Sequence, residues 1–278
     1  MKIALPSICL LFSVSISNAT VSVSGATGAG WVSLGTGFDK VGDESTAQSD
    51  IVGDAANPGF FTGFNDNGTA TPLDDTIAFR VRLDDHGGAG PSIAFDKNIW
   101  IGIDADLNGS VDAFIGVNKT QLTISDSGGG LNNSPNTTTI ANTAAFTYAD
   151  SAANFNYRAV NFATDGGTTN DLSPGGTDTD YYVSCVVSFA DVVSFLTTQS
   201  ITIDKNSHVQ YLVATAQGVN LGQDVGRLDD TLVGSNSTTS WTTLGVFSNQ
   251  VPASVPECSA TLLTFIGSVF AFGFRRRR

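Results

Sequence analysis

A nine-residue stretch with oxygen-bearing side chains at alternating positions is the part of this sequence best suited to chemistry. Gly109 stands at its sixth position, where a loop that turns sharply around an ion needs the freedom of glycine. Calcium takes about six to eight oxygen ligands, and carboxylates supply both oxygen and negative charge. The spacing therefore predicts a calcium site whose ligands are the side chains of Asp104, Asp106, Asn108 and Asp112 and the backbone carbonyl of Ser110. The alternative is an Asn-Gly hairpin turn that carries these acids by chance.

The residues around this loop predict strands rather than helices. Apolar, β-favouring runs flank it on both sides, at Trp100–Ile103 and at Ala113–Val117. Ile115 occupies the twelfth position, where an EF-hand has a bidentate glutamate. The loop instead resembles the β-hairpin calcium loops of the integrin and FG-GAP type. That resemblance implies an ion that stabilises the fold.

Other groups that could do catalysis lack the partners they need. No Gly-x-Ser-x-Gly nucleophile motif occurs, and the two histidines, His86 and His208, are far apart in the sequence. Cys185 lies in a β-type run and is expected to be a small buried hydrophobe. Adjacent aspartates at 74–75, 84–85 and 229–230 are typical of turns or calcium ligands rather than of a glycosidase acid and base. The sequence therefore predicts a protein that is not an enzyme.

The composition predicts an all-β fold and excludes one large class of partners. The chain has 278 residues, 41% of them hydrophobic, and its 30 glycines and 18 phenylalanines favour short strands joined by tight turns. Only 14% of the residues are charged, and the net charge is −13. Because nucleic acid is also negatively charged, we expect no binding to it.

Period-two alternation in several segments predicts strands with one buried and one wet face, as in a sandwich of two sheets. Arg80 and Arg82 alternate with apolar residues, so we expect them on the outer face, paired with aspartates. Ser188, Asp191 and the apolar residues after them predict a short helix that closes an end of the sandwich. The expected fold is a single antiparallel, jelly-roll-like β-sandwich over residues 20–254. Its clearest strands are Thr76–Leu83, Asn98–Ile103, Val111–Val117, Gln121–Ser125, Phe155–Phe162, Tyr181–Val187, Val209–Ala214 and Trp241–Ser248.

The first nineteen residues have the pattern of a secretory signal peptide. Lys2 precedes an apolar run, Ile8–Phe12, and small residues end at Ala19, after which we expect cleavage. The chain is therefore expected to leave the cytoplasm.

The last 24 residues, 255–278, have the pattern of a second targeting segment. Val255, Pro256, Glu257 and Cys258 are followed by an apolar stretch, 259–274, long enough for a short transmembrane helix of about 24 Å. Four arginines, Arg275, Arg276, Arg277 and Arg278, then place the end of the chain on the cytoplasmic side. A plain membrane anchor is the alternative interpretation.

This ending resembles the PEP-CTERM sorting signal of Gram-negative bacteria, with Cys258 where that family has its second proline. The resemblance implies secretion through the inner membrane, cleavage by an exosortase, and transfer to the cell surface or an exopolysaccharide matrix. Further segments resemble surface proteins that carry such tails, and they imply no enzymatic activity. They are Ser49–Asp54, Ala78–Leu83, Ile101–Val117, Asp180–Ser184, Val213–Gln217 and Trp241–Gly245.

Removal of both ends makes the remaining chain more acidic. Without Lys2 and the four terminal arginines 8 basic residues are left, and without Glu257 25 acidic ones, so the net charge is −17. A non-enzymatic, calcium-stabilised surface or matrix protein is the first hypothesis. A carbohydrate-binding module for exopolysaccharide is the second. It would need exposed aromatic residues such as Trp31 or Trp100, and burial of all three tryptophans would count against it.

Overall fold

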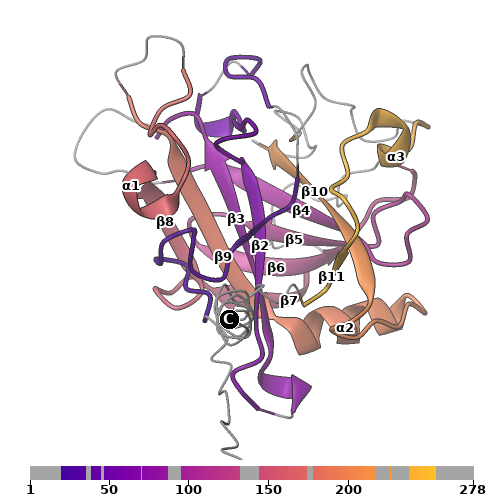
Figure 1. Cartoon of the computed structure of the whole chain (residues 1–278). Coiled ribbons are helices and arrows are strands. Elements are labelled where there is room, and N and C mark those ends of the chain that lie inside the picture. The colour runs from indigo at the N-terminus through magenta and orange to yellow at the C-terminus, as the bar shows by residue number, and fades with distance from the viewer. Residues whose placement is uncertain are drawn as a thin grey trace, which may run out of the picture. The chain divides into compact units, whose positions relative to one another are not determined.

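Two antiparallel sheets form the framework of the described chain (Figure 1). This computed structural model describes residues 20–35, 39–44, 47–69, 71–86, 95–131, 144–173, 178–216, 226 and 238–254. They belong to one compact unit, Ala19–Glu257. The predicted signal peptide, the motif Val255–Cys258, the apolar stretch 259–274 and Arg275–Arg278 lie outside the described residues. Among the residues described, no helix has the length and apolar character needed to cross a membrane.

The first sheet has five strands in the order β1-β2-β3-β9-β8. Its longest pairing joins β3 and β9, in register from Thr76 opposite Ser188 to Leu83 opposite Tyr181. The strands are β1 (Val32–Ser33), β2 (Phe60–Asn65), β3 (Thr76–Leu83), β8 (Phe155–Ala159) and β9 (Tyr181–Ser188).

The second sheet has six strands in the order β11-β10-β4-β5-β6-β7. Its centre is the β4–β5 hairpin, whose last ladder pair before the turn is Ile103 opposite Ala113. The strands are β4 (Asn98–Asp104), β5 (Ala113–Val117), β6 (Gln121–Asp126), β7 (Ala144–Ala149), β10 (His208–Ala216) and β11 (Val251–Pro252).

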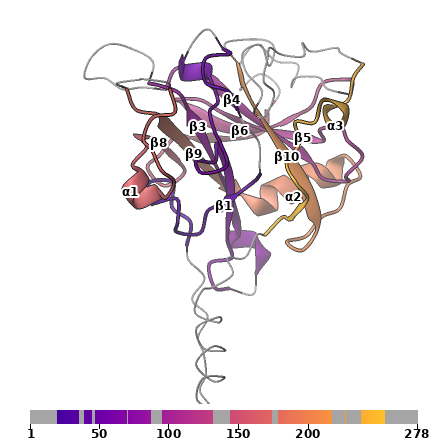
Figure 2. The ribbon, with the colours of Figure 1, turned by 45° about the horizontal axis from the view of Figure 1, so that its top comes forward.

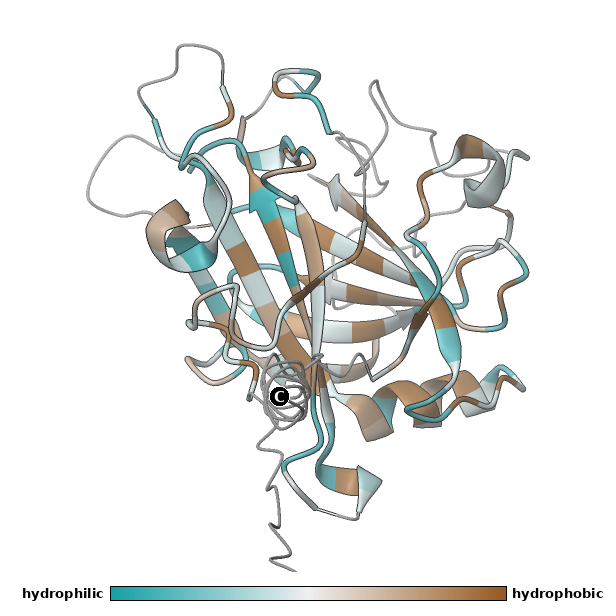
Figure 3. Cartoon of the chain, in the orientation of Figure 1, coloured by the Kyte–Doolittle hydropathy of each residue, from teal (hydrophilic) through white to brown (hydrophobic). Residues whose placement is uncertain are grey.

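One hydrophobic core is shared by the two sheets. Alternate residues of β3, such as Ile77 and Phe79, pack with Ile101 of β4 and Tyr211 of β10 in a single buried cluster. The rings of Phe79 and Tyr211 meet edge to face, with centroids 5.1 Å apart. The alternation is visible along the strands as brown and pale or teal bands (Figure 3). Apolar burial between the sheets is therefore the main force that holds them together.

A helix covers one end of this core, as the sequence predicted. The helix α2 (Phe189–Thr198) begins after Ser188, whose hydroxyl accepts a hydrogen bond from the Asp191 amide at 3.2 Å. Val192 and Leu196, one turn apart, are buried in the shared core. The remaining helices are short: η1 (Ala47–Ser49), η2 (Pro72–Asp74), α1 (Phe162–Asp165) and α3 (Trp241–Leu244).

Two strand predictions need correction. The segment Trp241–Ser248 begins with the one-turn helix α3, which lies beside β10 in both views (Figures 1 and 2). Ser240 caps its amino end, and Gly245, with φ 76°, ends it in the left-handed region. The predicted strand Phe155–Phe162 ends at Ala159, because Asn161 caps α1.

The outer face of the first sheet is not wet at Arg80 and Arg82, contrary to the expectation. Both side chains are buried. Arg80 donates to the carbonyl oxygens of Val23 and Gly25 at 3.0 and 2.8 Å, and its guanidinium lies 4.2 Å from the ring centre of Trp31. The segment 20–31 therefore forms a strap over this face. Burial lowers the pKa of Arg80 to about 10.

Candidate functional site

The predicted calcium loop is the turn of the β4–β5 hairpin. Asp104 is the last residue of β4 and has no exposed surface. Asp112 directly precedes β5, and its amide donates to the Ile103 carbonyl at 2.8 Å, which closes the hairpin. The apolar strands thus bring the two ends of the nine-residue loop together.

The structure brings three of the predicted ligands to one point. Asp104, Asp106 and Asp112 each contribute a carboxylate oxygen, and these oxygens lie within 4.8 Å of one another. Calcium–oxygen distances are about 2.3–2.6 Å, so two ligands on opposite sides of one ion are separated by roughly twice that. The three carboxylates therefore fit around a single calcium ion.

Backbone amides of the loop fix the orientation of these carboxylates. Asp104 accepts hydrogen bonds from the amides of Asn108 and Gly109 at 3.1 and 3.0 Å, and Asp112 accepts one from Ala105 at 2.7 Å. Leu107 and Gly109 have φ values of 61° and 86°, which curl the loop tightly. The carboxylates are thus preorganised by the chain itself.

Asn108 lies against the same group of acids. Its side-chain amide nitrogen donates to Asp106 at 2.9 Å, and its amide oxygen accepts from the Ser110 backbone at 2.8 Å. Asn108 is therefore beside Asp106, and coordination through its side-chain oxygen stays a prediction. Ser110 follows it in the turn, and coordination through the Ser110 carbonyl stays a prediction.

The negative charge of this loop is not balanced by a nearby basic side chain. Among the residues that the structure describes, no lysine or arginine forms an ion pair with Asp104, Asp106 or Asp112. Burial raises the pKa of Asp112 to about 6 and also raises the pKa of Asp104. A bound cation would stabilise the ionised carboxylates and so lower their pKa values again.

The helix α3 packs against the back of the loop, a contact that the sequence analysis missed. A methyl group added at Gly109 would come within 2.4 Å of the Thr242 hydroxyl oxygen. The Ser240 cap and the glycine at 245 were the available signals for this helix. The α3 segment therefore holds the loop from outside the hairpin.

A second group of three carboxylates lies at the end of the first sheet. Oxygens of Asp84, Asp171 and Asp180 lie within 4.8 Å of one another. Here Arg82 is part of the group, because its Nε donates to Asp180 at 2.5 Å in a fully buried ion pair. Burial raises the pKa of Asp180, and Arg82 acts in the opposite direction. The sequence analysis did not find this group, since its members come from three segments that only folding brings together.

The tryptophans offer no exposed surface for stacking on a sugar. Trp31, Trp100 and Trp241 retain 6%, 2% and 0% of their accessible surface. Trp100 packs edge to face on Phe114 at 6.0 Å, on the outer face of the second sheet. The exposed tryptophan side chains expected of a carbohydrate-binding module are therefore not found, and this counts against that hypothesis.

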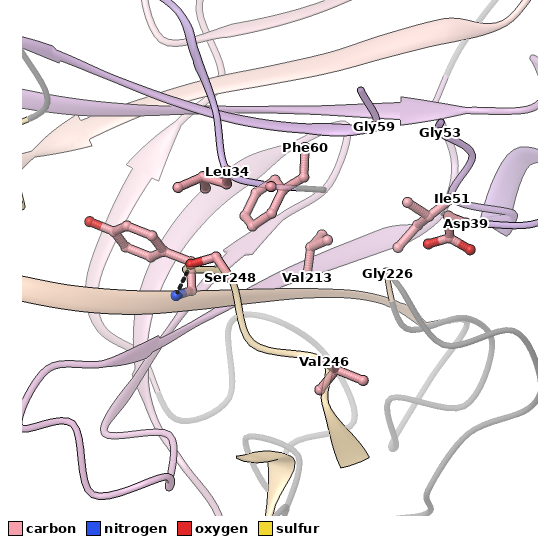
Figure 4. Close-up of a pocket in the computed structure, with 12 residues that line it drawn as sticks. Leu34, Asp39, Ile51, Gly53, Gly59, Phe60, Val213, Gly226, Val246 and Ser248 are labelled. Carbon is pink, nitrogen blue, oxygen red and sulfur yellow. Dashed lines mark hydrogen bonds between the residues drawn. The ribbon is translucent and has the colours of Figure 1, made fainter. Parts of the chain in front are cut away.

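A pocket beside the shared core is too small for an organic ligand. It has a volume of about 20 Å³, and Leu34, Phe60 and Val213 are among the residues that line it (Figure 4). The Ser248 hydroxyl closes one side by accepting a hydrogen bond from the Tyr211 amide at 3.0 Å. A cavity of this size has room for about one water molecule.

Comparisons of the chain with protein-family models, with curated proteins and with solved structures found no match.

Proposed function

We propose that this chain is a non-enzymatic, calcium-stabilised protein of the bacterial cell surface or exopolysaccharide matrix, secreted and processed by an exosortase. The observation that carries the calcium part is the loop Asp104–Asp112. Three carboxylate oxygens from Asp104, Asp106 and Asp112 converge within 4.8 Å, and no described basic side chain pairs with them. Oxygen-rich, negatively charged loops of this size suit calcium better than softer metals.

The ends of the sequence support the location. A signal peptide over 1–19 and a Val-Pro-Glu-Cys motif, apolar stretch and arginine cluster over 255–278 are the expected addresses for export and sorting. Along the sequence, the hydrogen-bonded part of the described fold extends from Val21, which is bonded to Asn65, to Ser254, which is bonded to Lys205. Both predicted sorting segments therefore lie outside it in the sequence. Export to a calcium-containing medium agrees with an ion that stabilises the folded domain.

The two sheets support assignment to a β-sandwich, which we propose to be of the jelly-roll type. A single core between antiparallel sheets is the defining feature of sandwiches. Exopolysaccharide is the proposed partner in the matrix, and a pull-down on the organism's own polysaccharide, with and without calcium, tests that partner.

The calcium proposal is tested by thermal unfolding of residues 20–254 in excess calcium and in chelator. A ligand that binds only the folded state at about a hundred times its Kd adds about 2.7 kcal/mol to the free energy of unfolding. We therefore expect a clearly higher Tm in calcium, and an equal rise in magnesium alone would contradict calcium selectivity.

The variant Asp106→Asn removes one charge from an exposed side chain while keeping its size. We expect calcium affinity to fall about tenfold, by isothermal titration calorimetry, because one anionic ligand is lost. The matched control is Asp96→Asn, an exposed aspartate outside the loop that pairs only with Lys97. Equal affinities of the two variants would place the ion elsewhere.

The sorting proposal is tested by the mass of the protein recovered from its native host. We expect a mature chain that begins at Thr20 and lacks Arg275–Arg278. A chain that retains the four arginines would support the plain membrane anchor instead.

A further inference from the structure

A second, larger concavity lies away from the calcium loop, beside the helix α2. It has a volume of about 490 Å³, within the usual range for small-molecule sites. It lies between η2, α2 and the turn at 203–206. Most of its wall is apolar and comes from Pro72, Leu73, Phe189, Ala190, Val193 and Ile203.

Leu73 marks the open edge of this groove. It retains 77% of its accessible surface, more than any other large hydrophobic side chain among the described residues. Covering this side chain with a ligand would remove apolar surface from water, which is favourable. The groove therefore offers apolar surface that an organic ligand can bury.

The side chain of Asp75 lines the same groove, and its carboxylate has no hydrogen-bond donor among the described residues. Asp75 retains only 3% of its accessible surface. Its backbone carbonyl accepts from the Phe189 amide at 3.0 Å, but its carboxylate accepts no hydrogen bond among the described residues. The adjacent Asp74 differs, because it is exposed and accepts from the Thr69 hydroxyl at 2.8 Å. A ligand that donates hydrogen bonds to the Asp75 carboxylate would therefore gain a charge-assisted contact there.

The charges around the groove favour a cation. Asp75 and Asp204 line it. Burial is the main cause that raises the pKa of Asp75, and Asp74 and Asp66 raise it further, each by less than Lys205 lowers it. Lys205 is the basic residue of the described lining, and it acts on Asp75 in the opposite direction. The acidic groups outnumber the basic one, so an anionic ligand is disfavoured.

We propose that this groove binds a small organic cation, whose ammonium or guanidinium group donates to Asp75 and whose apolar body packs on Leu73 and Val193. This function goes beyond the proposed calcium stabilisation and does not depend on it. The Asp75 carboxylate supplies selectivity for positive charge, and the leucine and valine supply contact area.

The test is a titration followed by ¹H–¹⁵N correlation spectra, in calcium-containing buffer, with three probes of equal chain length. Hexylammonium carries the positive charge, hexanol is neutral and hexanoate is negative. We expect hexylammonium to bind with a Kd in the range of about 1 mM, with shifts confined to η2, α2 and residues 203–206. Hexanoate binding as tightly as hexylammonium would overturn the proposal.

Two variants separate the contributions of charge and apolar surface. Asp75→Asn should weaken hexylammonium about tenfold and leave hexanol unchanged, and Leu73→Ser should weaken both probes. The matched control Asp74→Asn should change hexylammonium affinity less than twofold, because that carboxylate is outside the groove and solvated. Leu73 is exposed, so the fold does not depend on it, and unchanged binding in Leu73→Ser would also contradict the proposal.

Discussion

The two groups of three carboxylates have the same size and differ in how their charge is balanced. At the end of the first sheet, where Asp84, Asp171 and Asp180 cluster, the buried Arg82 donates to Asp180. In the β4–β5 loop, Asp104, Asp106 and Asp112 have only backbone amides and Asn108 as donors among the described residues. The first group thus has an arginine paired with one of its carboxylates, and the second has no basic side chain paired with it in the part of the chain that the structure describes.

This difference separates a structural ion pair from a candidate ion site. A guanidinium held by the fold compensates one carboxylate of its group permanently, so we expect the Arg82 group to depend less on a metal ion than the loop does. Amide donors orient a carboxylate but leave its full charge, so the loop is the better candidate for a cation from the medium. A count of clustered acids alone could not have distinguished the two groups.

Removal of the internal cation gives the largest expected effect. Arg82→Gln leaves buried carboxylates without compensation, and we expect the free energy of unfolding to fall by about 3–5 kcal/mol in urea denaturation. Added calcium should then recover part of the loss, because the group would resemble the β4–β5 loop.

The second variant for this comparison is Asp180→Asn in the Arg82→Gln background, which should recover stability by removing the unpaired charge. A loss below about 1 kcal/mol in the single variant would mean that Arg82 does not compensate this group.

A change in the shape of the calcium loop comes next. Gly109→Ala forces a side chain into the left-handed region and against the Thr242 hydroxyl, so we expect a loss of about 2 kcal/mol together with weaker calcium binding. Thr242→Ala should relieve only the steric part of the loss. A double-mutant cycle by chemical denaturation measures that coupling, and a coupling of zero would contradict the contact between α3 and the loop.

An artificial cation in the loop should make it resemble the Arg82 group. Asn108→Lys places an ammonium beside Asp106, which Asn108 contacts. If calcium affinity falls tenfold, the stabilisation by a hundredfold excess falls by about 1.3 kcal/mol. Thermal unfolding with and without calcium checks this, and an undiminished calcium response would contradict it.

The smallest expected effect concerns a single carboxylate, that of Asp150, which has neither a basic partner nor an amide donor among the described residues. Both oxygens of Asp150 are buried and accept no hydrogen bond, and burial raises its pKa to about 6. Because the folded protein then holds this proton more tightly than the unfolded chain, the stability of the native protein falls as the pH rises from about 4 to about 6.

Asp150→Asn should therefore be more stable than the native protein at pH 7, and the difference should vanish near pH 4. At pH 7 we expect the free energies of unfolding of the variant and the native protein to differ by about 1 kcal/mol. This is less than the pKa shift implies, because the side chain keeps partial exposure. Urea denaturation at both pH values measures the difference, and a constant difference would show that titration of Asp150 is not its cause.

The sequence predicted those features whose signals are local. The β3 limits, Thr76 and Leu83, were predicted to the residue, because alternation and flanking turn residues coincide there. The Ser188 cap and the loop spacing from Asp104 to Asp112 are equally local. Three of the predicted ligands, Asp104, Asp106 and Asp112, lie together in the structure, and calcium coordination by them stays a prediction.

Features that depend on contacts between distant segments were missed. Arg80 alternates with apolar residues as a surface residue would, and nothing near it in sequence indicates that residues 20–31 cover it. The group of Asp84, Asp171 and Asp180 was missed for the same reason, because segments distant in the sequence bring its members together. The segment at Trp241 read as a strand because its apolar residues outweighed the serine and glycine that cap a single helical turn.

The strap over the first sheet has a consequence for the order in which the chain folds. Thr27 bonds Asp165 through both its amide and its hydroxyl, and it accepts from Arg80. The earliest residues of the domain to leave the ribosome thus have partners that are synthesised more than a hundred residues later. Loop closure over such a distance is slow, so the contacts between Thr27 and Asp165 form only after most of the domain has emerged, later than those of the same segment with Asn65 and Arg80.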